Sequence, residues 1–242
     1  MSPRLRDQVR EQLPSAVLLL MDEIEAFAGL EIKFEPYLFP RPQQTFKANA
    51  AATMVTHQEA VIYLHDFEQV DLQAVTHELL HIRRYWIDGV PRFDPSRDAQ
   101  ANAAPCANFE NCLEHLYIVP QEADYGFDKT MWNGAARFTW QRWPWPEIGD
   151  DLGHRNKALL GVLETKLASD ADVLALAAGC LSKEGLSAEA ERFSRRIDQV
   201  LHSKERAASC LARFMKVPSG LLRLVYFDVR GRKWRAAALL DC

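Results

Sequence analysis

The stretch from Asp71 to Trp86 reads DLQAVTHELLHIRRYW and carries the strongest helix signal in this chain of 242 residues. Asp71 is a favourable N-cap because its carboxylate can accept a hydrogen bond from a backbone N–H of the first turn. The pair Asp88-Gly89 follows, and glycine is the residue that most often ends a helix. We therefore expect a helix from Leu72 to Trp86, buried through its leucine and isoleucine side chains.

Within this helix the sequence is His77-Glu78-Leu79-Leu80-His81. Residues four apart on a helix share one face, so both imidazoles can reach one ion. Imidazole nitrogens bind Zn²⁺ at about 2.0–2.1 Å. Glu78 would then lie close to the ion without binding it, where a carboxylate can act as general base. The pattern predicts a zinc site with His77 and His81 as ligands and Glu78 as catalytic base.

A catalytic zinc site needs a third protein ligand, and the next predicted helix, from about Ala107 to Val119, offers candidates. On a helical wheel Glu114 falls near the centre of the polar face, so we assign it as the third ligand. Glu110 and His115 stay open as alternatives. His115 also suits a second role, as a catalytic group that contacts the substrate or stabilises the oxyanion.

The His-Glu-x-x-His helix, the loop after it, and a helix with Glu110-Asn111 that ends at Pro120 resemble the ImmA/IrrE group of bacterial metallopeptidases. The resemblance covers about residues 50–125. It implies a zincin-like fold, one Zn²⁺, and cleavage of a helix-turn-helix transcriptional repressor, which switches on genes for DNA damage or phage defence. The chain departs from the group where Ala-Asn and Phe-Ala commonly follow the third-ligand glutamate.

Around the metal motif the pattern predicts an α+β protein. Alternation of polar and apolar residues predicts strands at about 31–38, 50–56 and 60–65, which we expect to form a small antiparallel sheet. The proline-rich segment Trp140–Gly149 cannot be helical throughout and marks a domain boundary. We expect a zincin-like domain over residues 1–147 and a mainly helical C-terminal domain over residues 148–242. Helices are expected near 152–168, 171–184, 186–201 and 204–215, followed by a β-hairpin over 221–240.

The C-terminal part is basic, although the whole chain has a net charge of −4. Residues 1–190 carry a net charge of −11 and residues 191–242 a net charge of +7. In the predicted hairpin an aromatic residue alternates with cations, a pattern suited to single-stranded nucleic acid. The candidate residues are Arg230, Arg232, Lys233, Trp234 and Arg235. The resemblance makes single-stranded DNA an expected activator and this domain a candidate sensor; a solvated basic hairpin is the alternative.

The five cysteines are widely spaced and form no Cys-x-x-Cys pair, which argues against a disulfide framework. Cys106 precedes the third-ligand helix. Because a thiolate binds zinc well, Cys106 is a candidate inhibitory ligand at the position that water needs. No apolar run approaches the roughly 20 residues needed to span a bilayer. We expect a cytoplasmic protein with no membrane partner.

The sequence thus predicts a zinc metalloendopeptidase acting on a protein, most simply a transcriptional repressor. One alternative is a DNA-binding or regulatory protein with a purely structural zinc site, in which Cys106 could be the fourth ligand and Glu78 would be dispensable. A zinc hydrolase that acts on another class of substrate is a further alternative.

Overall fold

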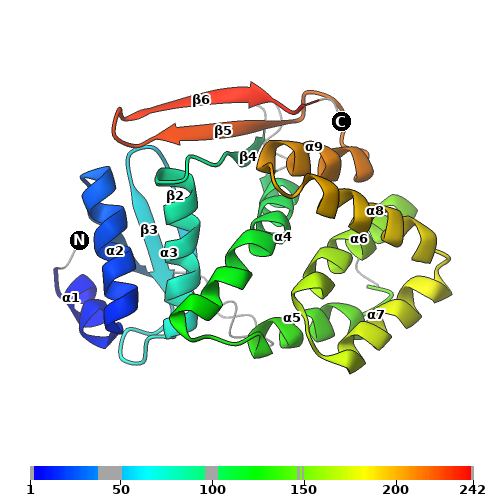
Figure 1. Cartoon of the computed structure of the whole chain (residues 1–242), viewed down its shortest axis with the longest axis horizontal. Coiled ribbons are helices and arrows are strands. Elements are labelled where there is room, and N and C mark those ends of the chain that lie inside the picture. The colour runs from blue at the N-terminus through cyan, green and yellow to red at the C-terminus, as the bar shows by residue number, and fades with distance from the viewer. Residues whose placement is uncertain (1–2, 38–50, 96–102, 146–147, 149, 241–242) are drawn as a thin grey trace. The chain divides into compact units, whose positions relative to one another are not determined.

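The computed structural model describes residues 3–37, 51–95, 103–145, 148 and 150–240, and it is an α+β fold (Figure 1). The helices are α1 (Pro3–Gln12), α2 (Ser15–Ala28), α3 (Leu72–Trp86), α4 (Ala103–Glu122), α5 (Thr130–Gln141), α6 (Asp151–Leu167), α7 (Ala171–Lys183), α8 (Ser187–Val200) and α9 (Lys204–Phe214), with a 3₁₀ turn η3 (Ala123–Tyr125). The strands are β1 (Lys33–Pro36), β2 (Ala51–Val55), β3 (Ala60–Leu64), β4 (Arg92–Pro95), β5 (Leu222–Asp228) and β6 (Lys233–Ala238). None of these helices is long and apolar enough to cross a membrane.

The chain divides into two compact units. The first comprises Met1–Pro91, Ile118–Asp128 and Tyr226–Arg235. The second comprises Arg92–Tyr117, Lys129–Val225 and Ala236–Cys242. A boundary near residue 147, which itself lies outside the described residues, does not separate these units, because the chain passes between them several times. The helix α4 is continuous and contributes residues to both.

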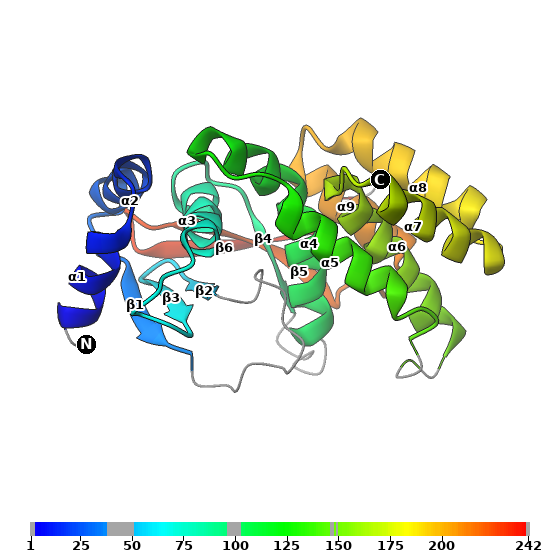
Figure 2. The same ribbon diagram turned by 90° about the horizontal axis from the view of Figure 1, so that it is seen from below.

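The first unit contains a three-stranded sheet in the order β1-β3-β2, with α2 and α3 side by side on one face (Figures 1 and 2). The strands β2 and β3 pair antiparallel as expected, but β1 pairs with β3 in parallel, so the prediction of a wholly antiparallel sheet is wrong. The core is formed by fully buried side chains such as Phe34 and Ile62 from the strands and Leu79 from α3. Each such side chain contributes about 1.5–3 kcal/mol of apolar burial.

The predicted metal-motif helix is confirmed with the expected bounds. The side chain of Asp71 accepts a hydrogen bond of 3.0 Å from the backbone N–H of Ala74, so it caps α3. Arg83 and Arg84 occupy the last turn, where positive charge is favoured by the helix dipole. Most of α3 is buried, which holds its side chains in defined directions.

The second unit is mainly helical, and the four helices expected after residue 150 are confirmed as α6 to α9. Close packing of α5 on α6 depends on Gly161, because a Cβ there would approach the Trp140 ring to 2.9 Å. The indole N–H of Trp140 donates to Thr165 Oγ1 at 2.8 Å. Trp140 and Trp145 are both 1% exposed, so this aromatic cluster is part of the core.

Two local predictions are wrong. The helix expected to stop before Pro120 continues through it to Glu122, since proline near a helix end removes only one backbone hydrogen bond. The segment predicted as a loop after Gly89 contains β4, whose partner is β5, an antiparallel strand more than 120 residues away. The C-terminal hairpin itself is confirmed as β5 and β6.

Candidate metal centre

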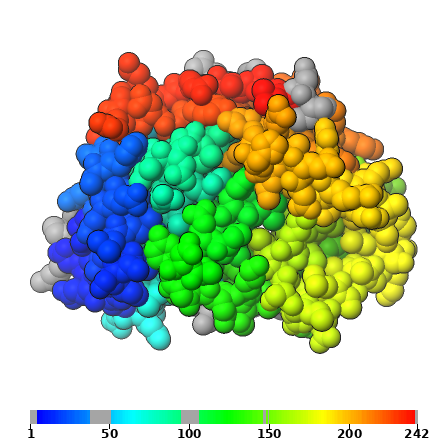
Figure 3. Space-filling view, viewed as in Figure 1, coloured from blue at the N-terminus to red at the C-terminus, as the bar shows by residue number. Residues whose placement is uncertain are grey.

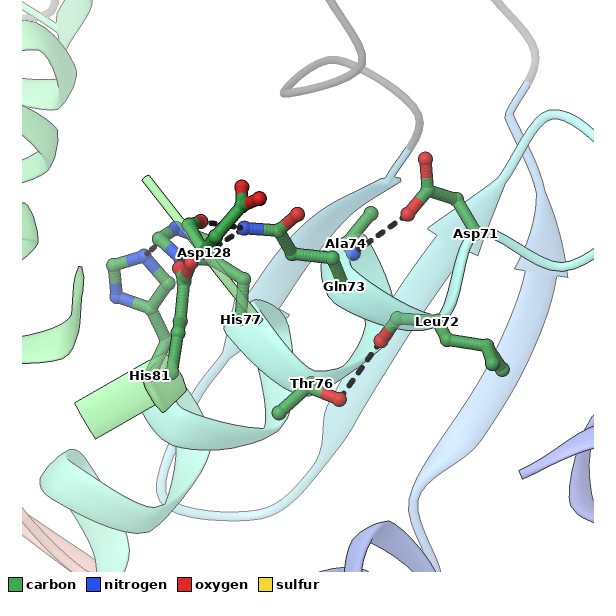
Figure 4. Close-up of polar contacts among 9 residues, drawn as sticks. Asp71, Leu72, Gln73, Ala74, Thr76, His77, His81 and Asp128 are labelled. Carbon is green, nitrogen blue, oxygen red and sulfur yellow. Dashed lines mark hydrogen bonds and ion pairs between the residues drawn. The ribbon is translucent and has the colours of Figure 1, made fainter. Parts of the chain in front are cut away.

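Two imidazoles one turn apart on α3 converge on a single point. The Nε2 atoms of His77 and His81 are 3.1 Å apart, and the two rings stand nearly perpendicular at 87° (Figure 4). Nitrogens that share a tetrahedral zinc ion at about 2.0–2.1 Å lie roughly 3.3 Å from each other. Both side chains are buried. The pair therefore has the spacing that two ligands of one ion require.

The third candidate ligand is His115 on α4. Among the residues that the structure describes, one group of His, Cys, Asp or Glu side chains could hold a metal ion: His77, His81 and His115, with ligand atoms within 4.8 Å of one another. The His115 ring also packs against Trp132, with ring centroids 4.8 Å apart. From the sequence, His115 was expected as a catalytic group or as an alternative ligand; its place in the group of three histidines favours the ligand role.

The two glutamates named as ligands from the sequence have another partner. Glu114 is 0% exposed, and its Oε1 lies 2.6 Å from Nζ of Lys204 on α9. Glu110 contacts the same ammonium group, and its second oxygen accepts a hydrogen bond of 2.7 Å from the backbone N–H of Phe93. Neither belongs to the group of three histidines. Since successive residues on a helix are about 100° apart, Glu114 points away from the direction of His115, and its assignment as third ligand is not supported.

A buried glutamate that the sequence analysis missed stands behind the first histidine. Glu122, at the end of α4, is 1% exposed, and its Oε1 lies 2.8 Å from Nδ1 of His77. Its Oε2 accepts a hydrogen bond of 2.8 Å from the side-chain amide of Gln73, which also reaches the backbone carbonyl of Asp128 (Figure 4). A helix extended through Pro120 would have placed Glu122 seven residues beyond His115, on the same face.

Glu78 follows His77 on the buried side of α3 and is 7% exposed. Burial raises the pKa of Glu78 to about 7, and the nearby His77 acts in the opposite direction. A carboxyl group with a pKa close to neutral can both take up and release a proton at physiological pH. This is the property that a general base next to a metal needs.

Cys106 lies in the first turns of α4 rather than in a loop, and it is 3% exposed. It does not belong to the group of three histidines. Nine residues separate it from His115 on one continuous helix, which is about 13 Å along the axis. Burial, and secondarily Glu110, raise the pKa of the Cys106 thiol to about 12. The inhibitory-ligand role predicted for Cys106 is therefore not supported.

We accordingly expect Cys106→Ala to leave zinc content and basal proteolysis unchanged, because a buried and protonated thiol is a poor metal ligand. Zinc per chain and cleavage rate should be compared with those of Cys112→Ala, a second buried cysteine on α4. A rise in basal proteolysis in Cys106→Ala alone would instead support an inhibitory thiolate.

The end of the hairpin that carries the basic residues, Tyr226–Arg235, belongs to the first unit. The hairpin is seen at the surface in Figure 3. Three of its cations have partners in the same unit: Arg230 lies over the Phe27 ring, Arg232 donates to the carbonyl of Gly29, and Arg235 stacks 3.8 Å from the centroid of Tyr226. Lys233 and Trp234 are exposed. The nucleic-acid role of these residues stays a prediction.

Comparison with known proteins returned no match. No protein-family model matches the chain, and neither does any curated protein or solved structure. The family resemblance of the His77–His81 motif therefore stands as a proposal.

Proposed function

We propose that the chain is a zinc-dependent endopeptidase with a zincin-like catalytic unit, in which His77, His81 and His115 hold the metal and Glu78 is the general base. The observation that supports this most directly is the 3.1 Å approach of the two Nε2 atoms on α3, with Glu78 buried beside them. In a metal-free protein the same 3.1 Å contact is a hydrogen bond between the two imidazoles, so the zinc content of the purified protein separates the metal site from a pair of core histidines.

The donor set fits zinc. Neutral imidazole is a preferred ligand of Zn²⁺, and three protein ligands leave the fourth position to water, as catalytic sites require. A structural site would be closed by a fourth protein ligand. Within the described part of the chain, the group contains three candidate ligands and no cysteine. This composition favours the catalytic reading over the regulatory protein with a structural zinc.

The chemistry divides between the metal and the protein. When bound, zinc would lower the pKa of a water molecule and polarise the carbonyl of the scissile bond. Glu78 would accept the proton of the attacking water on a carboxylate oxygen and donate it to the departing amine nitrogen. Its buried position keeps bulk water from competing for that proton.

The proposed substrate is a helix-turn-helix transcriptional repressor, and it rests on the resemblance to the ImmA/IrrE group alone. The same resemblance proposes single-stranded DNA as an activator. The side chains of Lys233 and Trp234 are exposed. The bases of such a strand could stack on the Trp234 ring, and its phosphates could pair with the Lys233 ammonium group.

The test combines metal analysis with proteolysis. We expect the purified protein to contain about one zinc per chain. Co-expressed with the repressor encoded by a neighbouring gene, it should cut that repressor, with or without a single-stranded oligonucleotide. A chelator should abolish cleavage, and added Zn²⁺ should restore it. Zinc that stays bound in a protein that cuts nothing under either condition would favour the structural site; a protein without zinc would refute the proposal.

A further inference from the structure

We infer that Glu122 is a positioning residue for the metal centre, which selects the tautomer and orientation of His77 and is itself held by Gln73. The inference rests on the proposed metal role of His77. It goes beyond the ligand set, because Glu122 contacts the ligand rather than the reacting atoms. All three residues belong to the first unit.

Ring geometry separates this role from direct metal binding. The two nitrogens of an imidazole lie on different edges of the ring, and in His77 each has a separate neighbour. Nδ1 faces Glu122 at 2.8 Å, whereas Nε2 faces Nε2 of His81 at 3.1 Å. A carboxylate at Nδ1 accepts the proton there, which leaves the lone pair on Nε2 for a metal. Glu122 therefore acts through His77.

Gln73 holds the carboxylate in place. Its side-chain N–H group donates to Oε2 of Glu122 at 2.8 Å and to the carbonyl of Asp128 at 3.3 Å. Gln73 and His77 are four residues apart on α3, so the two donors to Glu122 come from one face of one helix. Both carboxylate oxygens are thus engaged from α3, and the orientation of Glu122 is defined at two points.

Burial makes this contact strong. Glu122 is 1% exposed and the His77 side chain 8% exposed, so water does not compete for the hydrogen bond. Burying a carboxylate costs free energy unless the carboxylate is hydrogen-bonded, and the contacts with His77 and Gln73 offset that cost for Glu122. A carboxylate behind a ligating imidazole also increases the basicity of the ligand nitrogen. Loss of such a partner typically weakens metal binding by about 10–100-fold.

The experiment measures zinc affinity by competition with a chromophoric chelator at fixed pH, for Glu122→Leu, Glu122→Gln and Gln73→Leu. We expect Glu122→Leu to lose about 10–100-fold in affinity. Glu122→Gln should lose less, because its amide oxygen can still accept the Nδ1 proton. Gln73→Leu should lose least, since Glu122 keeps its bond to His77.

The matched control is Glu164→Gln on α6. Glu164 is a half-buried glutamate, and one of its oxygens accepts a hydrogen bond of 2.6 Å from Thr139. Its hydrogen-bond contacts are with Thr139 and Cys112 rather than with the histidines, so its replacement should leave zinc affinity unchanged. Thermal unfolding of each metal-free variant separates loss of folding from loss of metal binding.

A second readout is independent of the metal. In the metal-free wild type, ¹⁵N NMR of the imidazoles should show His77 protonated at Nδ1, and Glu122→Leu should shift it toward the other tautomer. Wild-type affinity in a folded Glu122→Leu variant, or an Nε2-protonated His77 in the wild type, would overturn the inference. If the wild type binds no zinc, the proposed function fails, while the tautomer measurement still decides the role of Glu122.

Discussion

Replacing Glu78 with Gln is expected to reduce peptide cleavage by about 10²–10⁴-fold, the usual contribution of a general acid–base group, while zinc stays bound. Glutamine has nearly the same shape, but its amide oxygen cannot take up a proton from water at neutral pH. Neither candidate metal ligand on α3 is changed. Because Glu78 is buried and its pKa is raised by desolvation, removing its charge should not destabilise the fold.

The measurement is single-turnover cleavage of the repressor, with zinc per chain determined on the same samples. Glu68→Gln, an exposed charge in the loop before α3, serves as the control and should behave as wild type. Full activity in Glu78→Gln would remove the general-base role. Loss of zinc together with activity would mean that Glu78 is needed to keep the metal bound rather than to transfer protons.

Replacing Lys204 with Met is expected to lower the free energy of unfolding by about 3–5 kcal/mol, the typical cost of breaking a buried ion pair from one side. The Lys204 side chain is 1% exposed and contacts both Glu110 and Glu114, which are 7% and 0% exposed. Methionine fills a similar volume but removes the charge that both carboxylates face. The cost is therefore electrostatic rather than a cavity effect.

Urea unfolding of the folded variant gives this free energy directly. The matched control is Lys166→Met, whose partner Asp198 is 55% exposed, and which should lose about 0–1 kcal/mol. Combining Lys204→Met with Glu110→Gln and Glu114→Gln should recover much of the loss, because no carboxylate then remains unpaired. A loss under about 1 kcal/mol in Lys204→Met, or no recovery in the triple variant, would contradict the electrostatic account.

Several parts of the fold follow from local sequence. The helix α3, its Asp71 cap and its two histidines were predictable because capping and the spacing of residues on a helix depend on neighbours a few positions away. The same holds for α6 to α9 and for the turn between β5 and β6. These elements agree with the expected bounds to within a residue or two.

Long-range pairing was not predictable in this way. Strand alternation indicates which face of a strand is buried but not its partner, so neither the parallel β1–β3 pair nor β4 could be predicted. The continuation of α4 through Pro120 depends on packing that offsets one lost hydrogen bond.

For the candidate site, too, the local features could be predicted from the sequence and the long-range contacts could not. By itself, the sequence determined that His77 and His81 share one face of one helix, with Glu78 about 100° around the helix from His77, since helical periodicity alone requires it. Only the tertiary structure decided which side chains on α4 complete the arrangement. A helical wheel places Glu114 nearer the centre of the polar face than His115 and so favoured Glu114 as the third ligand. Lys204, about 90 residues further along the chain, engages Glu114, and the fold brings Glu122 to the Nδ1 atom of His77. The distances that define a metal centre are set by packing between segments far apart in sequence, and no local pattern encodes them.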